Sequence, residues 1–167
     1  RFVATPEPSV TDLNMQELNR DYNISSAAEA FGYTAKWSVD NPKFELSATA
    51  GDSVSVRQME PLSSPDEAAN IMITYQKGTT SSTATVSLKG VIGVPDYDTF
   101  KLIGKGNYGL ERGYYQTQDF TIPNNTVHTP IGSYAAPFTG TYDGGNHTVK
   151  VGVISYNLAN IVQNDLK

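Results

Sequence analysis

Two alternating runs near the C-terminal end constrain the fold of this chain more than any other feature. Residues 137–141 and 148–154 alternate apolar with polar side chains, and Asp143-Gly144-Gly145-Asn146 stands between them. Period-two alternation is the pattern of a half-buried strand, and glycine and asparagine accept the positive φ that a tight reversal needs. The sequence therefore predicts a β-hairpin here. It also predicts a strand at residues 114–120, ended by the turn cluster Pro123-Asn124-Asn125.

The N-terminal half contains more runs of the same kind. Tyr33, Ala35, Trp37 and Val39 alternate with polar residues, so they share one face of a strand. Similar runs occupy residues 44–48, 54–56, 71–75 and 83–88, with turns or loops between them. Short strands at this spacing, with the single tryptophan on an early central strand, are typical of an immunoglobulin-like β-sandwich.

Several segments leave more than one interpretation open. Residues 10–21 fit a strand, a loop or one helical turn, and residues 25–30 fit a short helix or a strand. Residues 97–102 are predicted to form a strand. The tail, residues 155–167, has apolar residues at helical spacing but three asparagines that lower helix propensity, so it fits a short helix or one more strand.

The best domain boundary is Gly90-Val91-Ile92-Gly93-Val94-Pro95-Asp96, where two glycines and a proline coincide with a change of pattern. We therefore expect an all-β protein with an immunoglobulin-like sandwich at 10–92 and a smaller antiparallel or β-helix-like unit at 96–167. Residues 1–9 contain Pro6 and Pro8 and are expected to be extended. They are either a linker or a donor strand, Phe2, Val3 and Ala4, that pairs with the open sheet edge of a neighbouring subunit.

Both halves resemble known families. The strings Asp119-Phe120-Thr121-Ile122, Thr129-Pro130-Ile131-Gly132-Ser133 and Thr139-Gly140-Thr141-Tyr142-Asp143-Gly144-Gly145-Asn146-His147-Thr148-Val149 resemble a unit of the GLUG-repeat and β-helix-like segments of bacterial surface proteins. The family form has Asp-Gly-Asn-Gly-His-Thr-Ile at its turn, so Gly and Asn are exchanged here. A single unit is present, and a stacked solenoid needs about three. This resemblance implies extracellular architecture and no chemistry.

The N-terminal half resembles bacterial immunoglobulin-like domains more loosely. Trp37-Ser38-Val39-Asp40, Gly51-Asp52-Ser53-Val54-Ser55-Val56 and Ile71-Met72-Ile73-Thr74-Tyr75 carry this resemblance. The cysteine pair of antibody domains is missing, because the chain contains no cysteine. Disulfides and thiolate chemistry are therefore excluded.

Composition excludes further classes of partner. The formal net charge is −5, and no basic cluster exceeds two neighbouring cations, so nucleic acid is a poor partner. No apolar run is long enough to span a bilayer. Hydrophobic residues make up 38% and charged residues only 17%, the profile of an extracellular all-β protein. The chain begins at Arg1 without a signal core, so we expect a mature fragment that is secreted or displayed on a cell surface.

Candidate catalytic and metal-binding motifs are weak. Gly104-Lys105-Gly106-Asn107-Tyr108-Gly109 has the spacing of a dinucleotide-binding loop, but a predicted strand follows it instead of a helix, which favours a turn. His128 and His147 lack a carboxylate at metal-ligand or triad spacing. The turn aspartates Asp96, Asp98 and Asp143 match no calcium loop. We therefore expect no enzyme activity, no cofactor and no metal.

One aromatic group offers a binding hypothesis. Tyr108, Tyr114, Tyr115 and Tyr134 could stack on sugar rings, although alternation turns about half of such residues into the core.

The sequence thus favours a non-enzymatic extracellular structural or adhesion protein, a surface or filament subunit that assembles by protein contacts at β-edges. A carbohydrate-binding module that uses these tyrosines is the first alternative. A virion decoration or fibre subunit is another, because it would share every feature of the structural protein.

Overall fold

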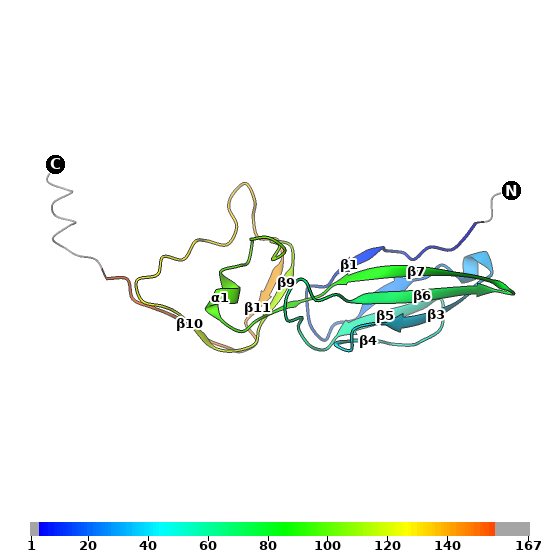
Figure 1. Cartoon of the computed structure of the whole chain (residues 1–167), viewed down its shortest axis with the longest axis horizontal. Helices are drawn as coiled ribbons and strands as arrows, with labels where there is room; N and C mark the ends of the chain where they lie inside the picture. The colour runs from blue at the N-terminus through cyan, green and yellow to red at the C-terminus, as the bar shows by residue number, and fades with distance from the viewer. Residues whose placement is uncertain (1–3, 156–167) are drawn as a thin grey trace.

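The computed structural model describes residues 4–155. The molecule is elongated, with a sandwich at the N-terminal end and a smaller unit at the C-terminal end (Figure 1). In chain order the elements are β1 (Asp12–Asn14), β2 (Tyr22–Ser25), a 3₁₀ turn (Glu29–Phe31), β3 (Thr34–Val39), β4 (Phe44–Leu46), β5 (Ser53–Gln58), β6 (Asn70–Lys77), β7 (Thr80–Lys89), β8 (Ile92–Val94), α1 (Tyr97–Phe100), β9 (Gly113–Gln116), β10 (Phe120–Ile122), β11 (Thr141–Asp143) and β12 (Val149–Val151).

Two sheets form the N-terminal sandwich. One sheet has the strand order β1-β7-β6-β3 and the other β2-β5-β4. All of their pairings are antiparallel except that of β1 with β7. Strands that are far apart in the sequence thus lie side by side in two facing layers, as in an immunoglobulin-like sandwich. The predicted all-β, immunoglobulin-like fold is confirmed.

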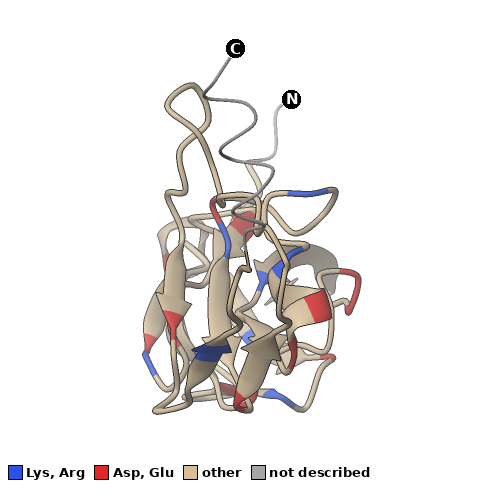
Figure 2. Cartoon of the chain, turned by 90° about the vertical axis from the view of Figure 1, so that its left-hand side faces the viewer, with Lys and Arg blue, Asp and Glu red and all other residues tan. Residues whose placement is uncertain are grey.

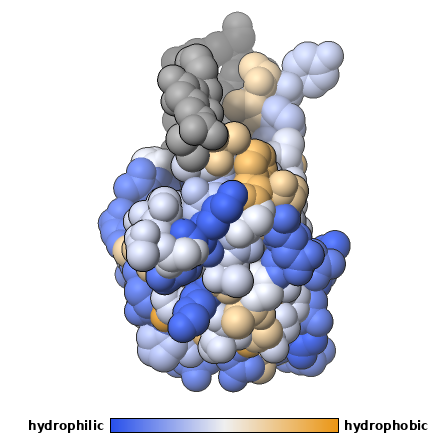
Figure 3. Space-filling view, turned by 90° about the vertical axis from the view of Figure 1, so that its right-hand side faces the viewer, coloured by the Kyte–Doolittle hydropathy of each residue, from blue (hydrophilic) through white to orange (hydrophobic). Residues whose placement is uncertain are grey.

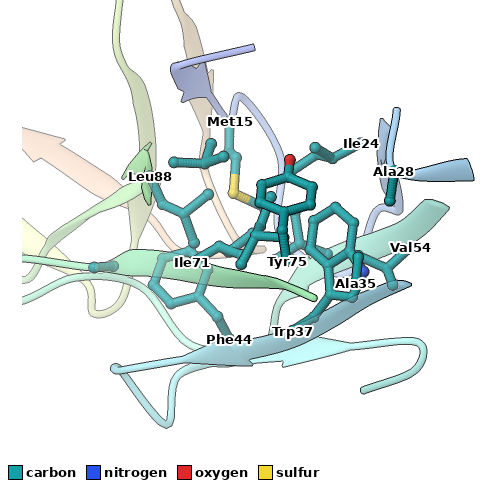
Figure 4. Packing of buried hydrophobic residues seen from close by; sticks show 14 of the residues in the cluster. Met15, Ile24, Ala28, Ala35, Trp37, Phe44, Val54, Ile71, Tyr75 and Leu88 are labelled. Atoms are coloured by element: carbon teal, nitrogen blue, oxygen red, sulfur yellow. The ribbon is translucent and has the colours of Figure 1, made fainter. Parts of the chain in front are cut away.

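The core of the sandwich follows from side-chain alternation. Ala35 and Trp37 on β3 are buried, and Lys36 and Ser38 between them are exposed. The indole Nε1 of Trp37 donates a hydrogen bond of 2.8 Å to the carbonyl oxygen of Gly51, so this large side chain is buried without an unpaired donor. Figure 4 shows the labelled core side chains packed together, with Trp37 beside Tyr75 and Ala35. The predicted inward face of this strand is therefore confirmed.

The C-terminal unit is built from parallel strands. One sheet has the order β11-β9-β8 and the other pairs β10 with β12. In register, Tyr142 lies beside Tyr114, and Val149 lies beside Phe120. The chain therefore runs β9 to β10, returns through a long loop, and repeats the same path one layer further as β11 to β12. This stacking of successive coils is β-helix-like.

The predicted hairpin is wrong. The runs around β11 and β12 do not pair with each other, because each pairs in parallel with a strand of the preceding coil. The turn between them has the predicted backbone, since Gly145 and Asn146 have φ of 57° and 60°. It turns a corner between two sheets and does not reverse the chain within one. Parallel stacking places Tyr142 and Val149 against the buried cluster of the unit, which an isolated hairpin would not do.

The strand predicted at residues 97–102 is also wrong. Tyr97–Phe100 is a single helical turn, because the side chain of Asp96 accepts a 2.8 Å hydrogen bond from the backbone nitrogen of Thr99 and caps its first turn. The ambiguous residues 10–21 contain β1, and 25–30 run from the end of β2 into the 3₁₀ turn. Most of the tail, 156–167, lies outside the described residues.

The segment expected to separate two domains contains β8. Ile92–Val94 is fully buried and pairs with β9 of the C-terminal unit. On its other side, the backbone nitrogen of Gly93 donates to the carbonyl oxygen of Leu62 over 2.8 Å. Ile92 and Val94 belong to the hydrophobic cluster of the C-terminal unit, and the sandwich has a separate cluster. The boundaries at 10–92 and 96–167 remain a prediction.

Candidate protein interaction surface

The C-terminal unit contains a long uncharged segment, which runs from β10 through the following loop to β11. No Asp, Glu, Lys or Arg occurs from Phe120 to Tyr142, although the whole chain carries 29 such residues, 12 basic and 17 acidic. Figure 2 shows that the loop rising above the body of this unit carries neither charge colour. The opposite end of the molecule is mostly hydrophilic at its surface, with a small apolar area beside the grey atoms (Figure 3). The uncharged segment therefore gives the C-terminal unit a less charged surface than that of the sandwich.

An apolar hollow of about 410 Å³ lies in the C-terminal unit. Phe100 of α1 forms part of its wall, with ring centroids 5.5 Å from Phe120 and 5.6 Å from Tyr142. These edge-to-face and tilted contacts between aromatic rings are favourable, so they fix the orientation of Phe100 in the wall. The hollow is lined by Phe100, Ile103, Ile122, Ile131, Phe138, Tyr142 and Val149.

A loop that joins two lining residues of the hollow carries a fully exposed tyrosine. Ile131 and Phe138 pack against the hydrophobic cluster and also line the hollow, so they fix both ends of the intervening loop. Within the loop, Ser133 N donates to Ala136 O over 2.9 Å, and Ala136 N donates to Ser133 Oγ over 3.1 Å. These bonds close a turn that presents Tyr134, whose side chain is fully exposed.

The last strand of the stack has an open edge. β12 pairs with β10 on one side, and no described strand pairs with its other side. The chain beyond β12 stays beside the preceding coil, since Val153 N donates to Asn124 Oδ1 over 3.0 Å. Apolar side chains follow this edge, with Val151 70% exposed, Val153 69% and Ile154 43%. We refer to the hollow, Tyr134 and this edge together as the distal surface.

The two ends of the stack therefore differ. The first strand, β8, is covered by the sandwich, because Ile92 forms a parallel bridge with Leu62. The last strands, β11 and β12, are edge strands in the described part of the chain. Exposed strand edges with apolar side chains are a liability that proteins usually cover. The exposed edges of β11 and β12 are therefore candidates for contact with another protein surface.

The four tyrosines of the glycan hypothesis do not form one platform. Tyr114 is fully buried, and its hydroxyl donates to the carbonyl oxygen of Gly109 over 2.7 Å. Burial raises the pKa of this phenol well above its usual value. Tyr108 and Tyr115 are half-buried, and Tyr134 is exposed on the distal loop. Tyr114 therefore presents no ring face to a sugar, and binding by the other three stays a prediction.

The donor strand also stays a prediction. Phe2 and Val3 lie outside the described residues, and Ala4 is exposed.

Sequence reasoning did not single out two buried polar residues of the C-terminal half, Gln116 and Arg112. Gln116 is almost fully buried, and its amide donates to Gln118 O over 2.9 Å and accepts from the Tyr142 hydroxyl over 2.9 Å. Burial raises the pKa of Tyr142 to about 12. The sequence could have predicted the burial of Gln116, because this residue is two positions after Tyr114 in the same strand and therefore points to the same inward face.

Arg112 is the second buried polar residue, and it borders a polar cleft of about 510 Å³ between the sandwich and the C-terminal unit. One guanidinium nitrogen donates to Gly90 O over 2.9 Å, while Nε has no partner. Burial lowers the pKa of this guanidinium. The cleft also contains Asp66, Glu67, Glu111 and Lys89, so its mixed charges favour no charged ligand.

Folding brings each histidine to a polar partner. His147 Nδ1 lies 3.2 Å from Asp119 Oδ1, which also accepts from Thr148 N over 2.8 Å. His128 Nδ1 lies 3.1 Å from the Tyr97 hydroxyl. In the part of the chain that the structure describes, neither pair is hydrogen-bonded to a third side chain that would complete a catalytic triad. Within residues 4–155, no group of three His, Asp or Glu side chains could hold a metal ion.

Taken together, the strand order and the stacked coils define an all-β protein with an immunoglobulin-like sandwich followed by a β-helix-like unit. No family model and no curated protein matches the sequence. Among solved structures, the titin M3 domain is similar over 51% of this chain and 97% of its own, with 17% identity and a TM-score of 0.30. The titin domain M7 is similar over 50% of this chain and 93% of its own, with 13% identity and a TM-score of 0.29. Similarity this low adds nothing to the fold assignment, which depends on the strand order.

No helix among the described residues has the length and apolar character needed to cross a membrane.

Proposed function

We propose that this chain is a non-enzymatic structural or adhesion protein, secreted or displayed at a cell surface, which acts through protein contacts made at its distal surface. The sandwich serves as a rigid support, and the C-terminal unit carries the contact. A surface or filament subunit is the form of this function that we favour.

The observation that carries the proposal is the open edge of β12. Val151 and Val153 are 70% and 69% exposed at the end of a parallel stack whose other end is covered by Leu62. Parallel strands are normally buried on both faces, so an exposed parallel edge with apolar side chains calls for a partner. The uncharged segment beside it lets a protein partner approach without the repulsion that a net charge of −5 would otherwise cause.

Sedimentation and light scattering of the full chain at rising concentration test this function. We expect the mean mass to rise with concentration, and we expect Val151→Lys combined with Val153→Lys to prevent the rise, because two buried ammonium groups would oppose any contact. Met72→Lys is the matched control, since Met72 is 39% exposed on β6 of the sandwich. Assembly by the double variant equal to that of the wild type would reject the β12 edge as the contact.

A further inference from the structure

We propose that the partner at the distal surface is a second copy of this chain, and that Tyr134 of each copy inserts into the apolar hollow of the other. This inference depends on the proposed function, because it names the partner and the anchor of the same surface. Beyond the proposed function, the inference names Tyr134 as the anchor, the apolar hollow as its receptor, and a two-fold axis as the symmetry of the complex.

The first argument is that the chain carries both halves of the contact. The hollow of about 410 Å³ is lined by apolar and aromatic side chains, and no described residue of its own chain fills it. Tyr134 is the opposite feature, a large ring that is fully exposed. A buried tyrosine or tryptophan that fills a pocket is the commonest type of anchor in protein interfaces.

The second argument is the presentation of Tyr134. The loop is closed by the bonds between Ser133 and Ala136, and it is fixed at both ends by Ile131 and Phe138. A ring on a turn that is already ordered loses little conformational entropy on binding. An exposed aromatic residue held in this way is suited to insertion into a partner.

The third argument is symmetry. Ile131 and Phe138 line the hollow and also flank Tyr134, so the protruding ring and its receptor are neighbours on one surface. A two-fold axis between two copies then forms both contacts at once, and the assembly closes as a dimer. If the ring and the hollow lay far apart on the molecule, each copy would instead bind the next one head to tail, and the assembly would grow into a fibre.

The fourth argument is charge. Two copies of a chain with net charge −5 repel each other over most of their surface. Residues 120–142 include the loop and much of the hollow, and they contain no charged side chain. Self-association is therefore least opposed at this surface.

The experiment measures the dimer dissociation constant of full-length variants by analytical ultracentrifugation. Tyr134→Ala should raise this constant at least tenfold, an order of magnitude typical of a hot-spot residue. Tyr134→Phe should leave it within about twofold if the hydroxyl stays at the mouth of the hollow. Val127→Ala, on the same uncharged segment, is the exposed apolar control and should also have little effect.

A mixing experiment separates direct contact from a structural effect. Val149→Trp should fill the hollow and leave Tyr134 intact, so it should not dimerise alone. Mixed with Tyr134→Ala, whose hollow is intact, it should form a heterodimer with one of the two contacts restored. Circular dichroism confirms that each variant folds, and Ile131→Trp replaces Val149→Trp if the latter does not.

The outcomes distinguish this inference from the proposed function. If the wild type assembles and Tyr134→Ala assembles equally well, the inference is wrong and the proposed function stands. If Tyr134→Ala abolishes the dimer while lysines at 151 and 153 do not, the inference stands and the β12 edge is rejected. A strictly monomeric wild type overturns the inference and also the filament form of the proposed function, and it leaves the hollow to another occupant, either residues 156–167 or a different protein to which this chain adheres.

Discussion

At the scale of single residues, the sandwich core depends on a small number of buried polar atoms with fixed partners. The hydroxyl of Tyr75 lies in the core and donates a 2.9 Å hydrogen bond to the carbonyl oxygen of Ser26. Burial raises the pKa of this phenol above its usual value, with smaller contributions from Asp52 and Glu7. The hydroxyl therefore stays protonated and acts as a donor.

Tyr75→Phe tests this contact. We expect the free energy of unfolding to fall by about 1–2 kcal/mol, because the Ser26 carbonyl loses its donor inside the core. Urea unfolding followed by Trp37 fluorescence measures the change. Tyr134→Phe removes an exposed hydroxyl and should change the same quantity by less than about 0.5 kcal/mol. Equal effects of the two variants would contradict the assigned role of Tyr75.

Glu67 gives the sandwich a defined pH dependence. Burial of this carboxyl group opposes its charged form, but hydrogen bonds from Lys43, Ser63 and Asn41 outweigh burial and lower its pKa from 4.5 to about 2. The ion pair with Lys43 has an Nζ to Oε1 distance of 2.7 Å. Because the folded pKa lies below the ordinary value, Glu67 stabilises the fold above pH 4.5, and this contribution is lost as the pH falls toward 2.

Glu67→Gln should therefore be less stable than the wild type at neutral pH by about 1–3 kcal/mol. The difference in the free energy of unfolding should shrink between pH 4.5 and about pH 2. Urea titrations of both proteins at several pH values measure it. A difference that stays constant down to pH 2 would show that the carboxylate charge contributes nothing.

At the scale of elements, the stacked coils depend on close backbone approach. A Cβ atom on Gly140 would clash with the backbone carbonyl oxygen of Arg112, at the start of the β11 and β9 pair. Neither backbone can move without breaking the parallel ladder that joins the coils. Gly144, three residues after β11 begins, has no atom within 4 Å of such a position.

Gly140→Ala should therefore destabilise the C-terminal unit by at least about 2 kcal/mol, whereas Gly144→Ala should change its stability by less than about 0.5 kcal/mol. Amide hydrogen exchange in β9 and β11 measures the stability of this unit directly. If the amide groups of β9 and β11 exchange as slowly in Gly140→Ala as in the wild type, the parallel register of β11 on β9 is wrong.

At the scale of the whole molecule, Gln58 links the sandwich to the beginning of the C-terminal unit. Its buried amide donates to Glu60 O and Val91 O and accepts from Val91 N, with distances of 2.9, 3.0 and 2.7 Å. Val91 directly precedes β8, so one side chain joins β5 of the sandwich to the first strand of the stack. Leu62 and Arg112 add further bonds across the same junction.

Gln58→Leu should lower the free energy of unfolding by about 1–3 kcal/mol, because Val91 N loses its acceptor and Glu60 O loses its donor, while Val91 O keeps its bond from Leu62 N. Urea unfolding monitored by Trp37 fluorescence measures the loss. The exposed Gln76→Leu provides the control and should be close to neutral. If both glutamine variants behave alike, the junction does not depend on the buried amide.

The sequence by itself determined most strands of the sandwich and which of their faces point inward. Alternation around Trp37 identified β3, and glycine with asparagine at 145 and 146 identified a turn of positive φ. Both are local properties, because a side chain's direction in a strand and a residue's allowed φ depend on the residue and its neighbours. The exposed Tyr134 of the distal surface was also among the residues selected from the sequence.

Only the tertiary structure decided which strands pair and what their packing leaves open. The runs at β11 and β12 have the composition of a hairpin, but they pair in parallel with β9 and β10, and Tyr142 and Val149 pack against the buried cluster. The same stacking creates the hollow from α1, β10, β12 and the loop between Ile131 and Phe138. Pairing and cavities depend on contacts between residues far apart in the chain, and local pattern does not encode those contacts.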